Sequence, residues 1–212
     1  SAVDSGNFAG HLIALAEACR QLAAPNGTDA PDGTDALDDA GRFGALAERA
    51  RAFAMEMDFT LLYEPSRKLF SIGYDVRASR LDPSAYDLLA SESRLTSFVA
   101  IAKGDVPVDH WFHLGRTLTT AAGATALVSW SGTMFEYLMP LLLMRSFPGT
   151  LLDQSCQASV TRQMDYARQR GIPWGISESA YPLTDRAGTY QYKAFGVPGL
   201  GLKRGLGDDV VI

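Results

Sequence analysis

Glu92 is the first residue of this 212-residue chain whose type and position suggest chemistry. If residues 83–103 form a helix, Glu92 falls in line with the apolar residues Leu88 and Leu95. A carboxyl group among apolar side chains is costly to ionise and can keep its proton at neutral pH, as a general acid must, unless a base such as Arg94 compensates. The spacing makes Glu92 a candidate general acid. The alternative is a structural ion pair or a capped core glutamate.

Glu136 is a second candidate, because it is the single charge in an apolar run directly after the Ser-Trp-Ser-Gly sequence at 129–132. Its carboxylate could take part in catalysis. It could equally anchor the loop by accepting hydrogen bonds from backbone N–H groups.

Glu178 lies between Trp174 and Tyr181 in a stretch without periodicity, which indicates a loop. Glycosidic chemistry uses two carboxyl groups that flank the scissile bond, and aromatic rings stack on the apolar face of a sugar. This pattern favours a carbohydrate site. Residues that could hydrogen-bond hydroxyls or stack on sugar rings are Asp4, Asn7, His11, Tyr74, Asp87, Arg94, Trp130, Tyr137, Trp174, Tyr181 and Tyr192.

Other chemistries have little support in the sequence. Cys19 and Cys156 have no CxxC spacing, and the three histidines are scattered, so we expect no metal site and no cofactor. The glycine-rich run at 196–201 contains a proline and lacks the strand-turn-helix setting of a phosphate loop. A serine hydrolase would need a GxSxG elbow, which is missing at 129–132.

The composition is that of an ordinary globular domain, with 47% hydrophobic and 20% charged residues. A net charge of −5 without clustered Lys and Arg speaks against a nucleic-acid partner. The opening residues are polar and lack a basic n-region, so we do not expect them to be a signal peptide. The longest apolar stretch, 134–144, is far shorter than the ~20 residues of a membrane helix.

Helical periodicity and end signals predict five helices joined by long connections. The predicted elements are helices at 8–24, 41–57, 83–103, 135–147 and 153–170, a mobile loop at 25–40, and a hairpin over 59–76. Residues 106–131 are compatible with a loop or a short strand. Because strands and helices do not alternate, the class is mainly α, and the long loops are where a site is expected.

Long sequence words in this chain resemble the central glucoamylase-like domain of bacterial cyclic β-1,2-glucan synthases. They include VDSGNFAGHL, MDFTLLYEPSRKLFSIGYDV, RLDPSAYDLLASESRLTSFVAIAKGDVP, HWFHLGR, SWSGTMFEYLMPLLLM, RGIPWGISESAY and YQYKAFGVPGLGLKRGL, and they span nearly the whole chain. The resemblance implies part of an (α/α) barrel of six helical hairpins, with short β-hairpin excursions. It also implies a single domain fragment, 1–212, truncated at both ends, in which the segment 25–40 replaces a longer helical stretch.

The resemblance implies a domain that cleaves linear β-1,2-glucan and joins the new end to the chain's own non-reducing end, giving a cyclic glucan. Glu92 is then expected as acid/base and Glu178 as nucleophile, or the reverse, with Glu136 as a third, orienting carboxylate. Trp130, Trp174, Tyr181 and Tyr192 are the expected stacking surfaces. The alternatives are a β-1,2-glucanase and a non-catalytic glucan-binding module.

The resemblance also implies partners. In the family, a glycosyltransferase module and a phosphorylase-like module flank this domain in the same polypeptide. The expected setting is the cytoplasmic side of the bacterial inner membrane, as a soluble part of a larger membrane protein.

Overall fold

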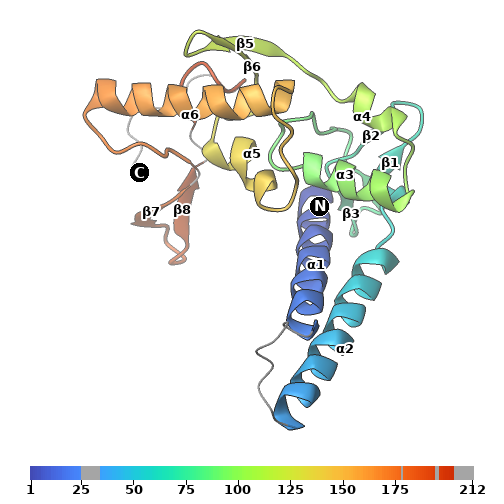
Figure 1. The fold of residues 1–212 in the computed structure, drawn as a ribbon. Coiled ribbons are helices and arrows are strands. Elements are labelled where there is room, and N and C mark those ends of the chain that lie inside the picture. Colours follow the sequence, from blue (N-terminus) through green and yellow to red (C-terminus); the bar gives the residue numbers. More distant parts are fainter. Residues whose placement is uncertain (25–33, 178, 194–195, 203–212) are drawn as a thin grey trace. The chain divides into compact units, whose positions relative to one another are not determined.

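The computed structural model describes residues 1–24, 34–177, 179–193 and 196–202, and it is mainly α-helical with small antiparallel strand pairs (Figure 1). The chain divides into two compact units. Unit 1 comprises 1–83 and 95–112, and unit 2 comprises 84–94 and 113–212.

Unit 1 is built on two long helices, α1 (Ala2–Ala23) and α2 (Thr34–Glu56), which lie side by side (Figure 1). Buried alanines recur at intervals of seven or fewer residues on both helices. Their small side chains allow the two helix backbones to approach closely. The buried alanines are Ala2, Ala9 and Ala16 on α1 and Ala47, Ala50 and Ala54 on α2. Phe8 packs edge-on against Phe53, with ring centroids 5.7 Å apart.

The rest of unit 1 consists of short elements. They are the 3-10 turn Thr60–Leu62, the strand pair β1 (Tyr63–Glu64) and β2 (Leu69–Phe70), the strand pair β3 (Tyr74–Asp75) and β4 (Arg80–Leu81), and the helices α3 (Arg94–Lys103) and α4 (Asp109–His113). The fully buried His110 ring bonds to the Lys68 carbonyl and the Ser97 hydroxyl, both at 2.9 Å. This histidine therefore links the turn between β1 and β2 to α3.

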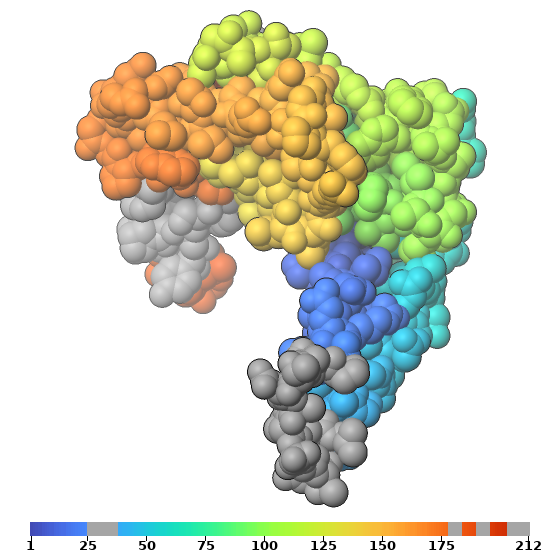
Figure 2. Space-filling view, viewed as in Figure 1, coloured from blue at the N-terminus to red at the C-terminus, as the bar shows by residue number. Residues whose placement is uncertain are grey.

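Unit 2 centres on the 20-residue helix α6 (Leu151–Arg170), which Thr150 caps and Gly171 ends in the left-handed conformation. Around it lie the hairpin β5 (Leu118–Ala121) and β6 (Ala124–Leu127), the helix α5 (Met134–Leu138) with the 3-10 turn η2 (Met139–Leu142), and the pair β7 (Ser179–Thr184) and β8 (Tyr190–Lys193). Figure 2 shows the yellow α5 segment packed against the orange α6.

Several predicted boundaries are corrected. The first helix begins at Ala2 because Ser1 caps it, and α2 begins at Thr34, so 34–40 is helical where a mobile loop was predicted. Within this helix, the Asp39 carboxylate accepts a hydrogen bond from Arg42 at 3.3 Å. Residues 25–33 lie outside the described part. The hairpin predicted over 59–76 is present as the β1–β2 pair, but it is shorter than predicted, because residues 74–75 pair with 80–81 instead.

The largest correction concerns the helix predicted over 83–103, since only Arg94–Lys103 is helical. Tertiary hydrogen bonds hold the preceding segment in turns: the Asp87 carboxylate accepts from Gly115 N–H at 2.9 Å, and Ser93 Oγ donates to the Asp87 carbonyl at 3.1 Å. Ser91 has a φ of +52°, which no right-handed helix contains. Glu92 is therefore buried in a turn of unit 2, and its apolar neighbours do not form a helical stripe.

Candidate active site

Glu136 is a buried carboxylate of unit 2 that accepts hydrogen bonds from several residues. Its side chain is 2% exposed and accepts hydrogen bonds from Ser129 Oγ at 2.8 Å, Ser131 N and Oγ at 3.0 and 2.8 Å, and Thr133 N at 3.2 Å. Thr133 and Glu136 also form a capping box at the start of α5. These bonds are the ones that the anchoring interpretation predicts. The carboxylate fixes the 129–132 loop that carries Trp130.

Ser91 brings a second carboxylate to this network. Its backbone N–H donates to Glu136 Oε1 at 3.4 Å, and its hydroxyl donates to Glu92 Oε2. Glu92 is 6% exposed. One serine thus joins two candidate carboxylates that are 44 positions apart in the sequence.

Arg94 and Tyr137 are buried beside the same hydrogen-bond network. Arg94 is 2% exposed and donates from its two Nη atoms to the carbonyls of Glu136, at 2.6 Å, and Tyr137, at 2.5 Å. Burial lowers its pKa to about 10, so the guanidinium stays charged at neutral pH.

Tyr137 is completely buried, and its hydroxyl donates to the carbonyls of Leu127, at 2.5 Å, and Leu200, at 3.0 Å. Burial raises its pKa well above the usual value for a phenol. Both Tyr137 and Arg94 were candidates for sugar contact. Their enclosure instead gives them the role of holding α5 to its surroundings.

The aromatic surface at this site comes from Trp130 and a residue that the sequence did not single out, Tyr86. Both rings are half-buried, with centroids 5.3 Å apart and planes inclined by 43°. The backbone N–H of Trp130 also donates to the Leu89 carbonyl at 3.3 Å. The pair places two aromatic rings on the segments that carry Glu92 and Glu136.

Residues 196–202 pack backbone against backbone on the 129–132 loop. Ser129 N–H donates to the Leu200 carbonyl at 2.9 Å, and Leu202 N–H donates to the Ser129 carbonyl at 2.8 Å. Glycines permit this approach: a Cβ on Gly196 would lie 1.9 Å from the Ser131 carbonyl oxygen. The glycine-rich run is thus a packing segment for the loop.

Replacing Gly196 by Ala should destabilise the protein by at least about 2 kcal/mol, because the obstructing atoms are backbone and cannot rotate away. The measurement is the free energy of unfolding in urea. Gly44→Ala in α2 is the matched control, since no atom lies within 4 Å of a Cβ there and alanine should stabilise the helix by about 0.5 kcal/mol. Equal stability of Gly196→Ala and the parent would show that the two segments do not pack as described.

The remaining candidates divide between the two units. Asp4, Asn7 and His11 lie on α1 and Tyr74 lies on β3, all in unit 1. Asp4 and His11 are exposed; the Asp4 carboxylate accepts from Ser1 Oγ at 2.7 Å, and His11 Nδ1 bonds to the Asn7 carbonyl at the same distance. These contacts are local to α1.

In unit 2, Asp87 is half-buried, and its carboxylate accepts a hydrogen bond from Gly115 N–H. Trp174 is 52% exposed. Glu178 lies outside the described residues, as do the side chains of Tyr181 on β7 and Tyr192 on β8. The structure therefore leaves the predicted Glu92–Glu178 pair untested.

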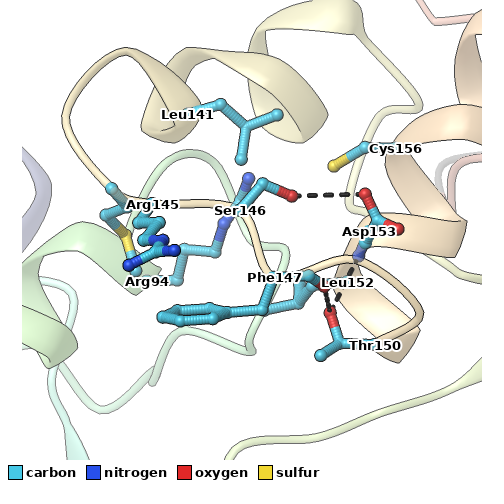
Figure 3. Close-up of a pocket in the computed structure, with 10 residues that line it drawn as sticks. Arg94, Leu141, Arg145, Ser146, Phe147, Thr150, Leu152, Asp153 and Cys156 are labelled. Atoms are coloured by element: carbon cyan, nitrogen blue, oxygen red, sulfur yellow. Dashed lines mark hydrogen bonds between the residues drawn. The ribbon is translucent and has the colours of Figure 1, made fainter.

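A small pocket lies beside this network in unit 2 (Figure 3). Its volume is about 50 Å³, far below the ~300–1,000 Å³ of ligand pockets. Its lining residues are Arg94, Leu141, Met144, Arg145, Ser146, Phe147, Thr150, Leu152, Asp153 and Cys156. Burial raises the pKa of the Cys156 thiol, and the bond from Gly149 N–H, at 2.9 Å, lowers the pKa of Asp153. The bonds of Asp153 hold the first turn of α6.

Two further properties of the described residues bear on function. None of their helices combines the length and apolar character of a membrane span. Among the same residues, no cluster of three or more His, Cys, Asp or Glu side chains is arranged to hold a metal ion.

Comparisons with known proteins bear directly on the site. Residues 85–212 match the model of the Glycoamylase family, whose description is "Putative glucoamylase". The sequence is 55% identical over 171 residues, or 81% of this chain, to the cyclic beta-(1,2)-glucan synthase NdvB of Rhizobium meliloti (strain 1021). The match spans 6% of the length of that synthase. The family match includes Glu92, Glu136 and the 129–132 loop.

Proposed function

Because the chain belongs to the Glycoamylase family, we propose that it is part of an enzyme that cleaves and rejoins β-1,2-glucan, with transfer to the chain's own end giving a cyclic product. The observation that carries the proposal is the identity to a cyclic β-1,2-glucan synthase. The arrangement of Glu92, Ser91 and Glu136 supports it, because a glycosidic site needs buried carboxyl groups in fixed positions beside aromatic rings.

In the proposed reaction Glu178 is the nucleophile and Glu92 the acid/base. The Glu178 carboxylate attacks C1 of a glucose unit, while protonated Glu92 gives its proton to the departing O2 of the next unit, so a glycosyl ester forms as the glycosidic bond breaks. Glu92, now ionised, takes the proton from the 2-hydroxyl at the non-reducing end of the same glucan. That oxygen attacks C1, forms the new β-1,2 bond and releases the Glu178 carboxylate.

The two carboxyl groups would stand about 5 to 5.5 Å apart, as retaining glycosidases require. Their roles could also be exchanged. If water takes the place of the sugar hydroxyl in the second step, the same residues give hydrolysis. Trp130 is the proposed stacking surface in the described part of the site, and Glu136 acts by fixing the loop that carries it.

The wider setting of this chain belongs to the same proposal. We assign unit 2 and the α1–α2 pair to parts of an (α/α) barrel, with glycosyltransferase and phosphorylase-like modules flanking it in one polypeptide. The large size of the synthase relative to the match supports such modules. The proposed location is the cytoplasmic face of the bacterial inner membrane.

The test is incubation of the chain with linear β-1,2-glucan, followed by mass spectrometry of the products. The expected product is a cyclic glucan, which weighs one water less than the linear chain of equal length. Shorter linear chains alone would identify a glucanase. Glucan binding by calorimetry without any product would identify a binding module, and neither binding nor product would contradict the proposal.

A further inference from the structure

We propose that Ser91 is a positioning residue. It holds the Glu92 carboxylate in a fixed position relative to Glu136, which is itself anchored. This inference rests on the proposed function, because it assigns Ser91 a task in the same site. The geometry is specific: one residue gives its backbone N–H to Glu136 Oε1, at 3.4 Å, and its hydroxyl to Glu92 Oε2.

The backbone conformation of Ser91 supports this role. Its φ of +52° lies in the left-handed region, which disfavours residues that carry a Cβ. Glycine would adopt this conformation more easily, but glycine has no hydroxyl to donate to Glu92. Disfavoured conformations of this kind are concentrated at functional sites, where a side chain must point in one direction.

The surrounding bonds fix Ser91 from both sides. Before it, Ala90 N–H donates to the Asp87 carbonyl at 3.2 Å; after it, Ser93 N–H donates to the Ala90 carbonyl at 3.3 Å. Glu136 is itself held by Ser129, Ser131 and Thr133. Ser91 therefore connects the Glu92 carboxylate to the buried hydrogen-bond network of Glu136, which holds that carboxylate in place.

A fixed direction matters for proton transfer. A carboxyl group that protonates the leaving oxygen and then deprotonates the incoming hydroxyl must lie within hydrogen-bond distance of both in turn. A side chain free to rotate would lose much of this effect, because productive geometry is required within a fraction of an ångström. Loss of the Ser91 hydroxyl should thus lower the rate of the chemical steps more than it weakens glucan binding.

The experiment compares Ser91→Gly and Ser91→Ala with the parent chain on linear β-1,2-glucan. Both variants lack the hydroxyl, but only Gly relieves the left-handed backbone, so their stabilities should differ while their activities fall together. We expect kcat to fall by about 10-fold in both, as for one lost hydrogen bond, with KM within about 2-fold of the parent. Thermal unfolding measures stability separately.

Ser79→Gly is the matched control. Ser79 also has a positive φ, +49°, but it is exposed in the turn between β3 and β4 of unit 1. It should keep the parental kcat. An unchanged kcat in Ser91→Gly would overturn this inference alone, and so would a loss of kcat that follows thermal stability across the two Ser91 variants. Absence of any turnover by the parent chain would overturn the proposed function and this inference together.

Discussion

Glu92→Gln should lower the kcat for β-1,2-glucan turnover by about 100- to 10,000-fold, the range in which a single general acid/base contributes. Glutamine keeps the size of the side chain and can accept from the Ser91 hydroxyl, but it has no proton to exchange with the leaving or incoming oxygen. The effect should therefore fall on kcat, with the fold retained. Product formation by mass spectrometry gives the rate, and circular dichroism during heating checks the fold.

Glu17→Gln on α1 is the control for the charge change, because this glutamate is exposed and lies in unit 1. It should retain the parental rate. Parental turnover by Glu92→Gln would remove Glu92 from the mechanism. An equal loss in both variants would trace the effect to net charge.

A second measurement separates the two roles of Glu92. Azide accepts a glycosyl group without giving up a proton, so it needs no general base. With a glucan substrate that carries a good leaving group, added azide should restore turnover of Glu92→Gln if Glu92 is the acid/base. The configuration of the glycosyl azide separates the roles. A β-glycosyl azide is expected if Glu92 is the acid/base, because the glycosyl ester still forms, whereas an α-glycosyl azide is expected if Glu92 is the nucleophile, because azide then attacks C1 directly.

The sequence predicted the elements whose signals are local. The carboxyl-terminal end of α6 follows from Gly171, and α3 ends at Gly104, whose φ is +85°, whereas α6 begins at Leu151, two residues before the predicted start, because Thr150 caps it. The segment 83–93 was predicted wrongly for the opposite reason. Its spacing of apolar residues fits a helix, but bonds to residues far along the chain, such as Gly115, outweigh that local preference.

The candidate site was accessible to sequence reasoning only in part. A lone glutamate after Ser-Trp-Ser-Gly suggested an anchored loop, and Glu136 does accept from that loop. The role of Ser91 could not be predicted, because it depends on a left-handed backbone and on a contact across 45 positions. The one available signal was a serine directly before a suspected catalytic glutamate. The packing of 196–202 likewise requires knowing which backbone its glycines approach.

Glu136→Gln should destabilise the protein by at least about 3 kcal/mol, because several buried donors face one carboxylate oxygen. An amide presents one oxygen and one NH₂ group, so some of the donors from Ser129, Ser131 and Thr133 would meet another donor without water to replace the lost bond. Since a domain is stable by only about 5–15 kcal/mol, a loss of this size should be evident as a lower midpoint in urea unfolding.

Asp153→Asn is the control that shows how much of the stability loss in Glu136→Gln is due to the burial of Glu136. The Asp153 carboxylate also accepts several bonds, from Gly149 N–H, Ser146 Oγ and Gln157 Nε2, but these bonds lie at the surface, where water can replace them. Its substitution should cost clearly less than that of Glu136. If both variants lost the same free energy of unfolding, the burial of Glu136 would not add to its contribution to stability. The 129–132 loop would then have to be held by its contact with 196–202 instead.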